Sequence, residues 1–181
     1  MLIIAIALIL GIFLISVMFN IFVSRRNMAE KSFATVDVML KKRFDLIPNL
    51  VETVKAYAGH EKETLERLIQ IRALAQRPEV SDREKMLLGS ESVPAISRII
   101  MLSESYPDLK ANENFINLQR SLNEIEEQIS AARRAYNSAI TDYNNYCEMF
   151  PFSLFAKVFG FKIKPLFSAA QPERESSVVK F

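Results

Sequence analysis

The sequence predicts an all-α protein in which an N-terminal transmembrane helix is followed by an antiparallel four-helix bundle with long, coiled-coil-like helices. Two observations lead to this fold class. Residues 1–24 carry no charged side chain, and downstream the apolar residues recur at alternating steps of three and four, which is typical of helices that pack along a seam. The 181 residues divide into a transmembrane anchor (1–24), a cytoplasmic helical bundle (25–150), a phenylalanine-rich amphipathic segment (151–167) and a polar tail (168–181) that we expect to be disordered.

The apolar stretch at the N-terminus is long enough to cross a bilayer. At about 1.5 Å per residue, a helix from Leu2 through Ile12 to Val23 covers the roughly 30 Å hydrocarbon core. A cleaved signal peptide needs basic residues at its start, a shorter apolar run and small residues at its cleavage site. The stretch shows none of these features, so an uncleaved anchor is favoured.

Basic residues directly follow this stretch and set the expected orientation. Arg25, Arg26 and Lys31 crowd its downstream end, and positively charged residues stay on the cytoplasmic side of a membrane. The N-terminus should therefore lie outside and the bundle in the cytoplasm. The single cysteine, Cys147, agrees with a reducing compartment.

The strongest periodic signal lies between residues 115 and 150 and predicts one long helix. Asn112 is a suitable N-cap, and Pro151 cannot continue a helix, so we expect this helix to run from Asn112 to Phe150. The residues of its seam are Phe115, Leu118, Leu122, Ile125, Ile129, Ala132, Tyr136, Ala139, Tyr143, Tyr146 and Phe150.

A second seam predicts the first helix of the bundle, at residues 29–58. Pro48 interrupts it, because the proline ring meets the carbonyl of Phe44 and the missing N–H leaves that carbonyl without its helical donor. The apolar pattern resumes in register after the proline, so one kinked helix is favoured over two. The pattern stops at residues 59–60, where either a turn follows or the helix continues.

Shorter helices are expected between these two seams. One runs to about Gln76. Ser81 and Glu84 have the capping-box spacing that begins another. This second helix either continues or breaks at residues 89–90, with Ser92 as a new cap.

The segment from Phe150 to Phe167 is rich in phenylalanine, contains three lysines and has no acidic residue. This composition is typical of a segment that lies at an anionic lipid surface. The alternative is that its phenylalanines fold back and cap one end of the bundle. The residues expected at a membrane interface are Phe152, Phe155, Lys157, Phe159, Lys162 and Lys164.

Composition argues against several functional classes. A net charge of +2 is too weak to indicate nucleic-acid binding, and one cysteine excludes an intrachain disulfide framework. Asp37, Asp45, Glu52 and Glu61 recur along the first bundle helix, but a di-iron site in a bundle also needs Glu-x-x-His pairs. His60 is the only histidine, so we expect no metal, no cofactor and no enzymatic activity, and a turn or cap role for His60.

The residues of this chain are similar to those of the LemA family of bacterial membrane proteins. The likeness runs from about Phe19 to Phe167. It includes the stretches Lys42–Lys55, Tyr57, His60–Glu61, Asn27, Val36–Val38, Leu40, Tyr106–Asn112, Ala132–Arg134, Tyr136–Asn137, Tyr143–Asn144, Phe150–Pro151 and Gly160–Phe161.

The resemblance implies a short outer N-terminus, one span of the bacterial inner (cytoplasmic) membrane and an antiparallel helical bundle in the cytoplasm, with no established catalytic activity. Two positions depart from the family pattern. Phe44 stands where the family usually has histidine, and Phe33 where it usually has tryptophan. Both changes keep an aromatic side chain, but any proton-transfer role of that histidine would be absent.

Tyrosines in the long seam need partners for their hydroxyl groups, because a buried hydroxyl without a hydrogen bond destabilises the fold. Such polar pairs would fix the register of the helices. The candidates for this network are Asp37, Arg43, Asp45, Asn49, Tyr136 and Tyr143.

Three functional classes follow from these features. The first is a membrane-anchored scaffold or adaptor whose bundle binds a protein partner or further copies of itself. The second is a membrane-shaping or lipid-organising protein that uses the phenylalanine-rich segment. The third is a regulatory relay across the membrane, which is weakened because Met1 leaves no outer domain to sense a signal.

Overall fold

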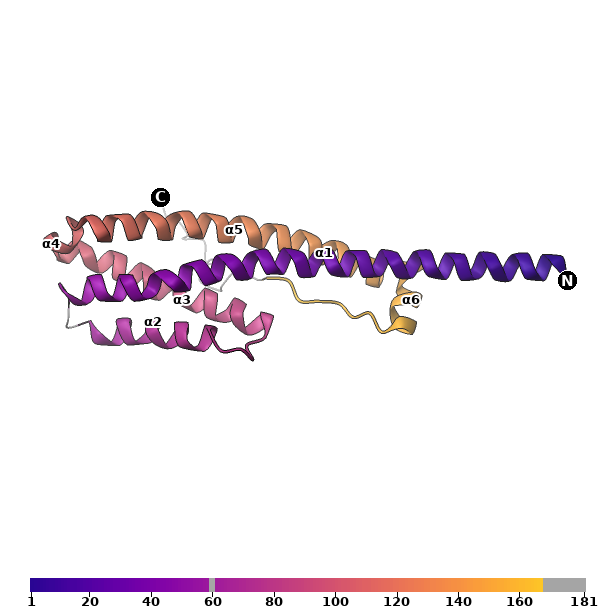
Figure 1. The fold of residues 1–181 in the computed structure, drawn as a ribbon, viewed down its shortest axis with the longest axis horizontal. Helices are drawn as coiled ribbons and strands as arrows, with labels where there is room; N and C mark the ends of the chain where they lie inside the picture. Colours follow the sequence, from indigo (N-terminus) through magenta and orange to yellow (C-terminus); the bar gives the residue numbers. More distant parts are fainter. Residues whose placement is uncertain (59–60, 168–181) are drawn as a thin grey trace, which may run out of the picture. The chain divides into compact units, whose positions relative to one another are not determined.

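The computed structural model describes residues 1–58 and 61–167. These residues contain no strand, so the prediction of an all-α protein is confirmed. The expected role of His60 and the expected disorder of residues 168–181 lie outside the described residues. The helices are α1 (Leu2–Lys55), α2 (Lys62–Ala75), α3 (Asp82–Leu102), the 3-10 helix η1 (Ser103–Ser105), α4 (Pro107–Lys110), α5 (Glu113–Glu148) and α6 (Phe152–Phe159) (Figure 1).

The described residues form two compact units. The N-terminal unit consists of Met1–Ala34 and Arg133–Phe167, and the bundle unit consists of residues 35–132. Helices α1 and α5 each contribute to both units.

Four long helical segments of the bundle unit come from α1, α2, α3 and α5, and the chain reverses direction from each to the next (Figure 1), with the short η1 and α4 between α3 and α5. Its core is a continuous set of apolar side chains from all four segments, which removes their apolar faces from water. The buried core residues are Val36, Leu40, Phe44, Ile47, Leu50, Val51, Val54, Ala58, Leu65, Leu68, Ile71, Leu88, Ile96, Ile99, Leu109, Phe115, Leu122, Ile129 and Ala132.

Helix α1 continues through Pro48 as a single helix. The proline cannot donate a hydrogen bond to the carbonyl of Phe44. Arg72 of α2 donates one instead, with its Nε 3.2 Å from the Phe44 oxygen. The carbonyl that lacks its helical donor in α1 therefore forms a polar contact with α2.

The break considered at residues 89–90 does not occur, because α3 runs unbroken from Asp82 to Leu102. Gly89 is buried where α3 approaches α1, and a Cβ added to it would lie only 2.7 Å from Leu40 Cδ2. Ser92 donates its hydroxyl to the Gly89 carbonyl at 2.8 Å and is not a helix cap. The small residue therefore permits close approach of two helices and does not end one.

The expected caps at Ser81 and Asn112 are present, since Ser81 Oγ accepts from the Glu84 N–H at 3.3 Å and Asn112 Oδ1 accepts from the Phe115 N–H at 3.0 Å. The predicted end of the long helix at Phe150 is wrong. Helix α5 ends at Glu148, and Phe150 lies beyond it with 80% of its surface exposed, so it is not part of the seam. Helix α1 ends at Lys55 and α2 begins at Lys62, so the helix does not continue through residues 56–58, while residues 59–60 lie outside the described residues.

Arg43 is the largest polar side chain in the core, with 1% of its surface exposed. Its Nη1 lies 2.6 Å from Glu126 Oε2 of α5, and its Nη2 donates to the Gly89 carbonyl of α3 at 3.1 Å. One guanidinium therefore connects three helices of the bundle unit. A buried charge of this kind depends strongly on its counter-ion, because the interior solvates it poorly.

We predict that Glu126→Ala lowers the free energy of unfolding by about 3 kcal/mol, because it leaves the Arg43 guanidinium buried without its carboxylate. The matched control is Asp45→Ala, which removes a carboxylate paired with the exposed Lys41 at 2.8 Å and should cost less than about 1 kcal/mol. Urea unfolding in mild detergent, followed by circular dichroism, measures both. Equal losses for the two variants would show that the Arg43 pair is no more stabilising than a surface pair.

Candidate functional site

The first part of α1 is apolar and exposed. By length and composition α1 could span a membrane, and its most apolar window is not covered by any other described part of the chain. Leu2 is 76% exposed, Ile12 65% and Phe19 42%. In water this surface would be strongly unfavourable, whereas the hydrocarbon core of a bilayer would cover it.

An aromatic cluster forms where this exposed stretch ends. Phe22, which is fully buried, stacks on Phe161 with ring centroids 4.7 Å apart and contacts Phe152 and Tyr146 edge-on at 6.2 and 6.4 Å. One turn earlier, Phe19 meets Phe159 and Phe161 at 5.5 and 6.0 Å. Helix α6 and the residues after it therefore pack against the last turns of the apolar stretch.

Gly160 redirects the chain after α6. Its φ of 74° places it in the left-handed region, where glycine has no Cβ clash, and the Phe161 N–H then bonds the Ala156 carbonyl at 2.9 Å. This is the usual glycine C-cap of a helix. Residues 161–167 continue without helical structure and lie along α5.

Side chains of α5 hold this segment through its backbone. Asn144 accepts from the Lys164 N–H at 2.9 Å and donates to the Lys164 carbonyl at 2.8 Å. Asn137 does the same to Phe167, at 2.7 and 2.9 Å. We call residues 161–167 the strap and these side chains, together with Tyr136 and Tyr143, the α5 ladder.

The two tyrosines complete the ladder. The Tyr143 hydroxyl donates to the Lys162 carbonyl at 2.9 Å and the Tyr136 hydroxyl to the Pro165 carbonyl at 3.4 Å. For Tyr143 this corrects the prediction of a partner among the polar residues at positions 37–49. The two asparagines were missed, although both tyrosines and both asparagines recur at a spacing of seven, which places each pair on one face of a helix.

Burial changes the acidity of two groups beside the strap. It raises the pKa of Tyr143 to about 12 from an ordinary 10.0, and an interaction with Cys147 acts in the same direction. Burial likewise raises the pKa of the Cys147 thiol. Cys147 is half-buried, and with a raised pKa it is protonated at neutral pH and a poor nucleophile.

The basic residues predicted to set the orientation lie on α1 beside the aromatic cluster. The Arg25 guanidinium lies over the Tyr146 ring, 5.0 Å from its centroid, and 3.9 Å from Asp142. Arg26 lies 3.8 Å from Glu30, and Lys31 is exposed. Their effect on orientation stays a prediction.

The six residues expected at a membrane interface fall into two groups. Phe152, Phe155 and Phe159 pack on one another, on Tyr146 or on α1. Among the lysines, Lys164 lies 3.2 Å from Glu30 of α1, while Lys157 and Lys162 are exposed.

The other predicted polar residues lie in the bundle unit and form separate contacts. Asp37 pairs with Lys85 of α3 at 2.9 Å, Asp45 pairs with Lys41, and Asn49 is exposed and lines a shallow pocket with Glu52 and other residues. Within residues 1–58 and 61–167, no three His, Cys, Asp or Glu side chains are close enough together to bind a metal ion.

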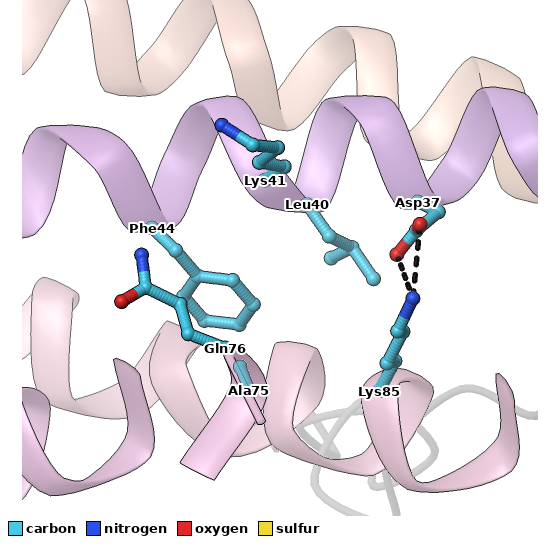
Figure 2. Close-up of a pocket in the computed structure, with 7 residues that line it drawn as sticks. All are labelled: Asp37, Leu40, Lys41, Phe44, Ala75, Gln76 and Lys85. Carbon is cyan, nitrogen blue, oxygen red and sulfur yellow. Dashed lines mark hydrogen bonds and ion pairs between the residues drawn. The ribbon is translucent and has the colours of Figure 1, made fainter. Parts of the chain in front are cut away.

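A pocket of about 420 Å³ opens beside the Asp37–Lys85 ion pair (Figure 2). Leu40 and Phe44 of α1 and Ala75 of α2 supply apolar surface, and polar groups surround it. The pocket combines an apolar floor with a charged rim, as sites for protein side chains and small ligands often do. Its lining residues are Asp37, Leu40, Lys41, Phe44, Ala75, Gln76 and Lys85.

We predict that alkaline pH destabilises the chain through Tyr143. The folded state keeps the Tyr143 proton up to about pH 12, and the unfolded state loses it near pH 10.0, so stability is full below pH 10 and falls as the pH rises toward 12. The loss is about 2 to 3 kcal/mol across this window. Tyr143→Phe has no hydroxyl to ionise and should show a smaller loss in urea unfolding at each pH. Identical pH dependence in both chains would place Tyr143 outside the core.

Comparisons with known proteins are consistent with this architecture. A LemA protein of Metamycoplasma hominis is 23% identical over 149 residues, which cover 82% of this chain and 68% of that protein. Magnetosome protein MamQ 2 of Paramagnetospirillum magneticum is 25% identical and magnetosome protein MamQ of Magnetospirillum gryphiswaldense is 23% identical, each over 169 residues. The match covers 80% of this chain but only 62% of either MamQ protein, so the chain spans less than two thirds of their length.

The LemA family model matches residues 32–181. This range includes α2 to α6, all of the part of α1 that lies in the bundle unit, the strap and the α5 ladder. The described residues are mostly helical and include one helix that is long and apolar enough to span a membrane. Because the family model matches more than half of the sequence, the chain belongs to the LemA family.

Proposed function

We propose that this chain is a scaffold or adaptor of the bacterial inner membrane. Residues 1–24 cross the bilayer with the N-terminus outside, and the bundle unit in the cytoplasm binds a protein partner or further copies of the chain. In this proposal the chain brings proteins together at the membrane and catalyses no reaction.

The membrane part of the proposal is supported by two features of α1. Its apolar residues from Leu2 to Phe19 are exposed, and hydrocarbon is the solvent that such a surface requires. Arg25, Arg26 and Lys31 follow immediately, which favours retention of that end in the cytoplasm.

The pocket between α1 and α2 is the observation that carries the protein-binding part (Figure 2). A volume of about 420 Å³ can admit large apolar side chains from a partner helix, which would pack against the half-buried Ala75 and against the small part of Leu40 and Phe44 that lines the pocket. The Asp37–Lys85 pair and Lys41 at the rim offer charges of both signs, and such rim charges select partners more than they add affinity. Confinement to a membrane raises the local concentration of any partner held in the same bilayer.

The test measures the mass of the intact particle after mild solubilisation from the membrane. We predict a particle heavier than one chain, either an oligomer or a complex with another protein. Ala75→Phe narrows the pocket and should shift the particle toward the mass of a single chain. Ala73→Phe makes the same substitution on an exposed position of the same helix and should leave the mass unchanged.

A single chain without another protein, or equal masses for the two variants, would argue against binding at this pocket. The first result contradicts the scaffold itself. The second contradicts only the assignment of the pocket.

The orientation is tested with one accessible thiol. Met101 is 73% exposed on α3, so Met101→Cys combined with Cys147→Ser gives a single reactive site in the bundle unit. We predict that a membrane-impermeant maleimide labels it only after the cells are permeabilised. Replacing Arg25, Arg26 and Lys31 by glutamine should increase labelling of intact cells, because the charge bias that retains the bundle is lost.

The matched control replaces three basic residues far from the apolar stretch, Lys55, Lys62 and Arg67, by glutamine. This variant should remain unlabelled in intact cells. If the Met101→Cys, Cys147→Ser chain with all its basic residues retained is labelled in intact cells, the bundle lies outside.

A further inference from the structure

Helix α6 and the residues around it have one covered side and one exposed side. The covered side holds Phe152 and the buried Ala156, together with Phe161 of the strap. On the exposed side, several large apolar side chains show more than half of their surface. They are Met149 (59%), Phe150 (80%), Leu154 (56%), Val158 (80%), Ile163 (62%) and Leu166 (51%).

An apolar surface of this kind marks an interaction site in a folded protein. Leu154 and Val158 are four residues apart and therefore share one face of α6, while Phe152 and Ala156 belong to the face that meets α1. The exposure of Leu154 and Val158 thus follows from how α6 packs.

The position of α6 along α1 identifies the occupant of this surface. Phe159 and Phe161 contact Phe19, which belongs to the exposed apolar stretch that could span a membrane. If residues 1–24 cross the bilayer, α6 lies where that span leaves the hydrocarbon. At this depth its outward apolar side chains meet lipid.

The charges of the segment agree with a lipid surface. Between Met149 and Phe167 there is no acidic residue. Lys164 is engaged with Glu30 at 3.2 Å, but Lys157 and Lys162 are exposed and form no ion pair with a described residue. Lysines next to apolar side chains at an interface attract anionic headgroups.

The α5 ladder keeps this surface in place. Asn144 and Asn137 bind the backbone of Lys164 and Phe167, and Tyr143 binds that of Lys162. These contacts use only the backbone of the strap, and the side chains of Lys162, Ile163 and Leu166 remain exposed.

We infer that residues 149–167 form a second membrane contact, in which the outward apolar side chains enter the lipid interface and Lys157 and Lys162 face anionic headgroups. The inference rests on the proposed crossing of the bilayer by residues 1–24. It adds a lipid-binding surface beside the span, with anionic phospholipid as the partner.

The test uses the absence of tryptophan from the sequence, so that one introduced tryptophan is the only indole in the full chain. Val158→Trp places it on the proposed lipid surface, and Met101→Trp places it on an exposed part of α3. Each chain is reconstituted in vesicles of phosphatidylcholine and phosphatidylglycerol that contain brominated lipid. We expect brominated lipid to quench Val158→Trp at least several-fold more than Met101→Trp, and aqueous iodide to quench them in the opposite order.

A third variant separates failure of this inference from failure of the span. Phe13→Trp lies in the apolar stretch, and brominated lipid should quench it whether or not α6 meets the bilayer. Quenching of Phe13→Trp by brominated lipid without such quenching of Val158→Trp overturns the second contact alone. Shielding of Val158→Trp from both quenchers also overturns the lipid contact, and assigns this surface to contact between copies of the chain. Absence of quenching at Phe13→Trp overturns the proposed span.

The role of the lysines is tested by lipid charge. Quenching of Val158→Trp should be weaker in vesicles of phosphatidylcholine alone, and replacing Lys157 and Lys162 by glutamine should abolish the difference between the two vesicle types. If Val158→Trp with both lysines retained is quenched equally in the two vesicle types, the assignment of these lysines to anionic headgroups is overturned. Circular dichroism of every variant verifies that the helices are retained.

Discussion

The exposed apolar surface of α1 is the constraint on which the N-terminal unit depends. From Leu2 to Phe19 the large apolar side chains are exposed to a degree that a water-soluble helix does not tolerate. Lipid can cover such a surface, but only as far as the hydrocarbon extends. Where the exposed apolar stretch of α1 ends, other parts of the protein cover the helix. Phe22 is fully buried among rings from α5, α6 and the strap.

The strap shows how an extended segment can be held without a β-sheet. Backbone N–H and C=O groups need partners when they leave solvent. Asn144 and Asn137 each offer an amide that matches both groups of one residue, as a neighbouring strand would. The two seven-residue repeats on α5 therefore serve two purposes, since Tyr136 and Tyr143 pack in the apolar seam and bind the strap with their hydroxyls.

In the bundle unit, arginines from two helices bind backbone carbonyls of their neighbours. Arg72 donates to the Phe44 carbonyl that Pro48 leaves without a helical donor. Arg43 donates to the Gly89 carbonyl and pairs with Glu126. Guanidinium groups suit these positions because they are planar, carry several donors and are weakly hydrated compared with an ammonium group. Polar contacts of this kind constrain how α1, α2, α3 and α5 are arranged around an otherwise apolar core.

The helical class, the apolar stretch, the seams and the caps at Ser81 and Asn112 could be predicted from the sequence alone. These features are local, because helical periodicity, absence of charge and capping depend on residues within a few turns of one another. The same reasoning located the defect at Pro48 and the Phe44 carbonyl, but could not name Arg72, which is 28 residues away in the chain.

Which groups meet across helices became known only from the packing of the helices. From its neighbours in the sequence, Gly89 was a possible helix break. In the fold it lies where α3 packs closely against Leu40 of α1. Asn137 and Asn144 have a structural role only because the strap returns to lie along α5. Phe150 fits the seven-residue pattern, but the helix ends before it. The outcomes at Gly89, Asn137 and Asn144 depend on segments distant in sequence, and periodicity along one helix carries no information about the element that packs against it.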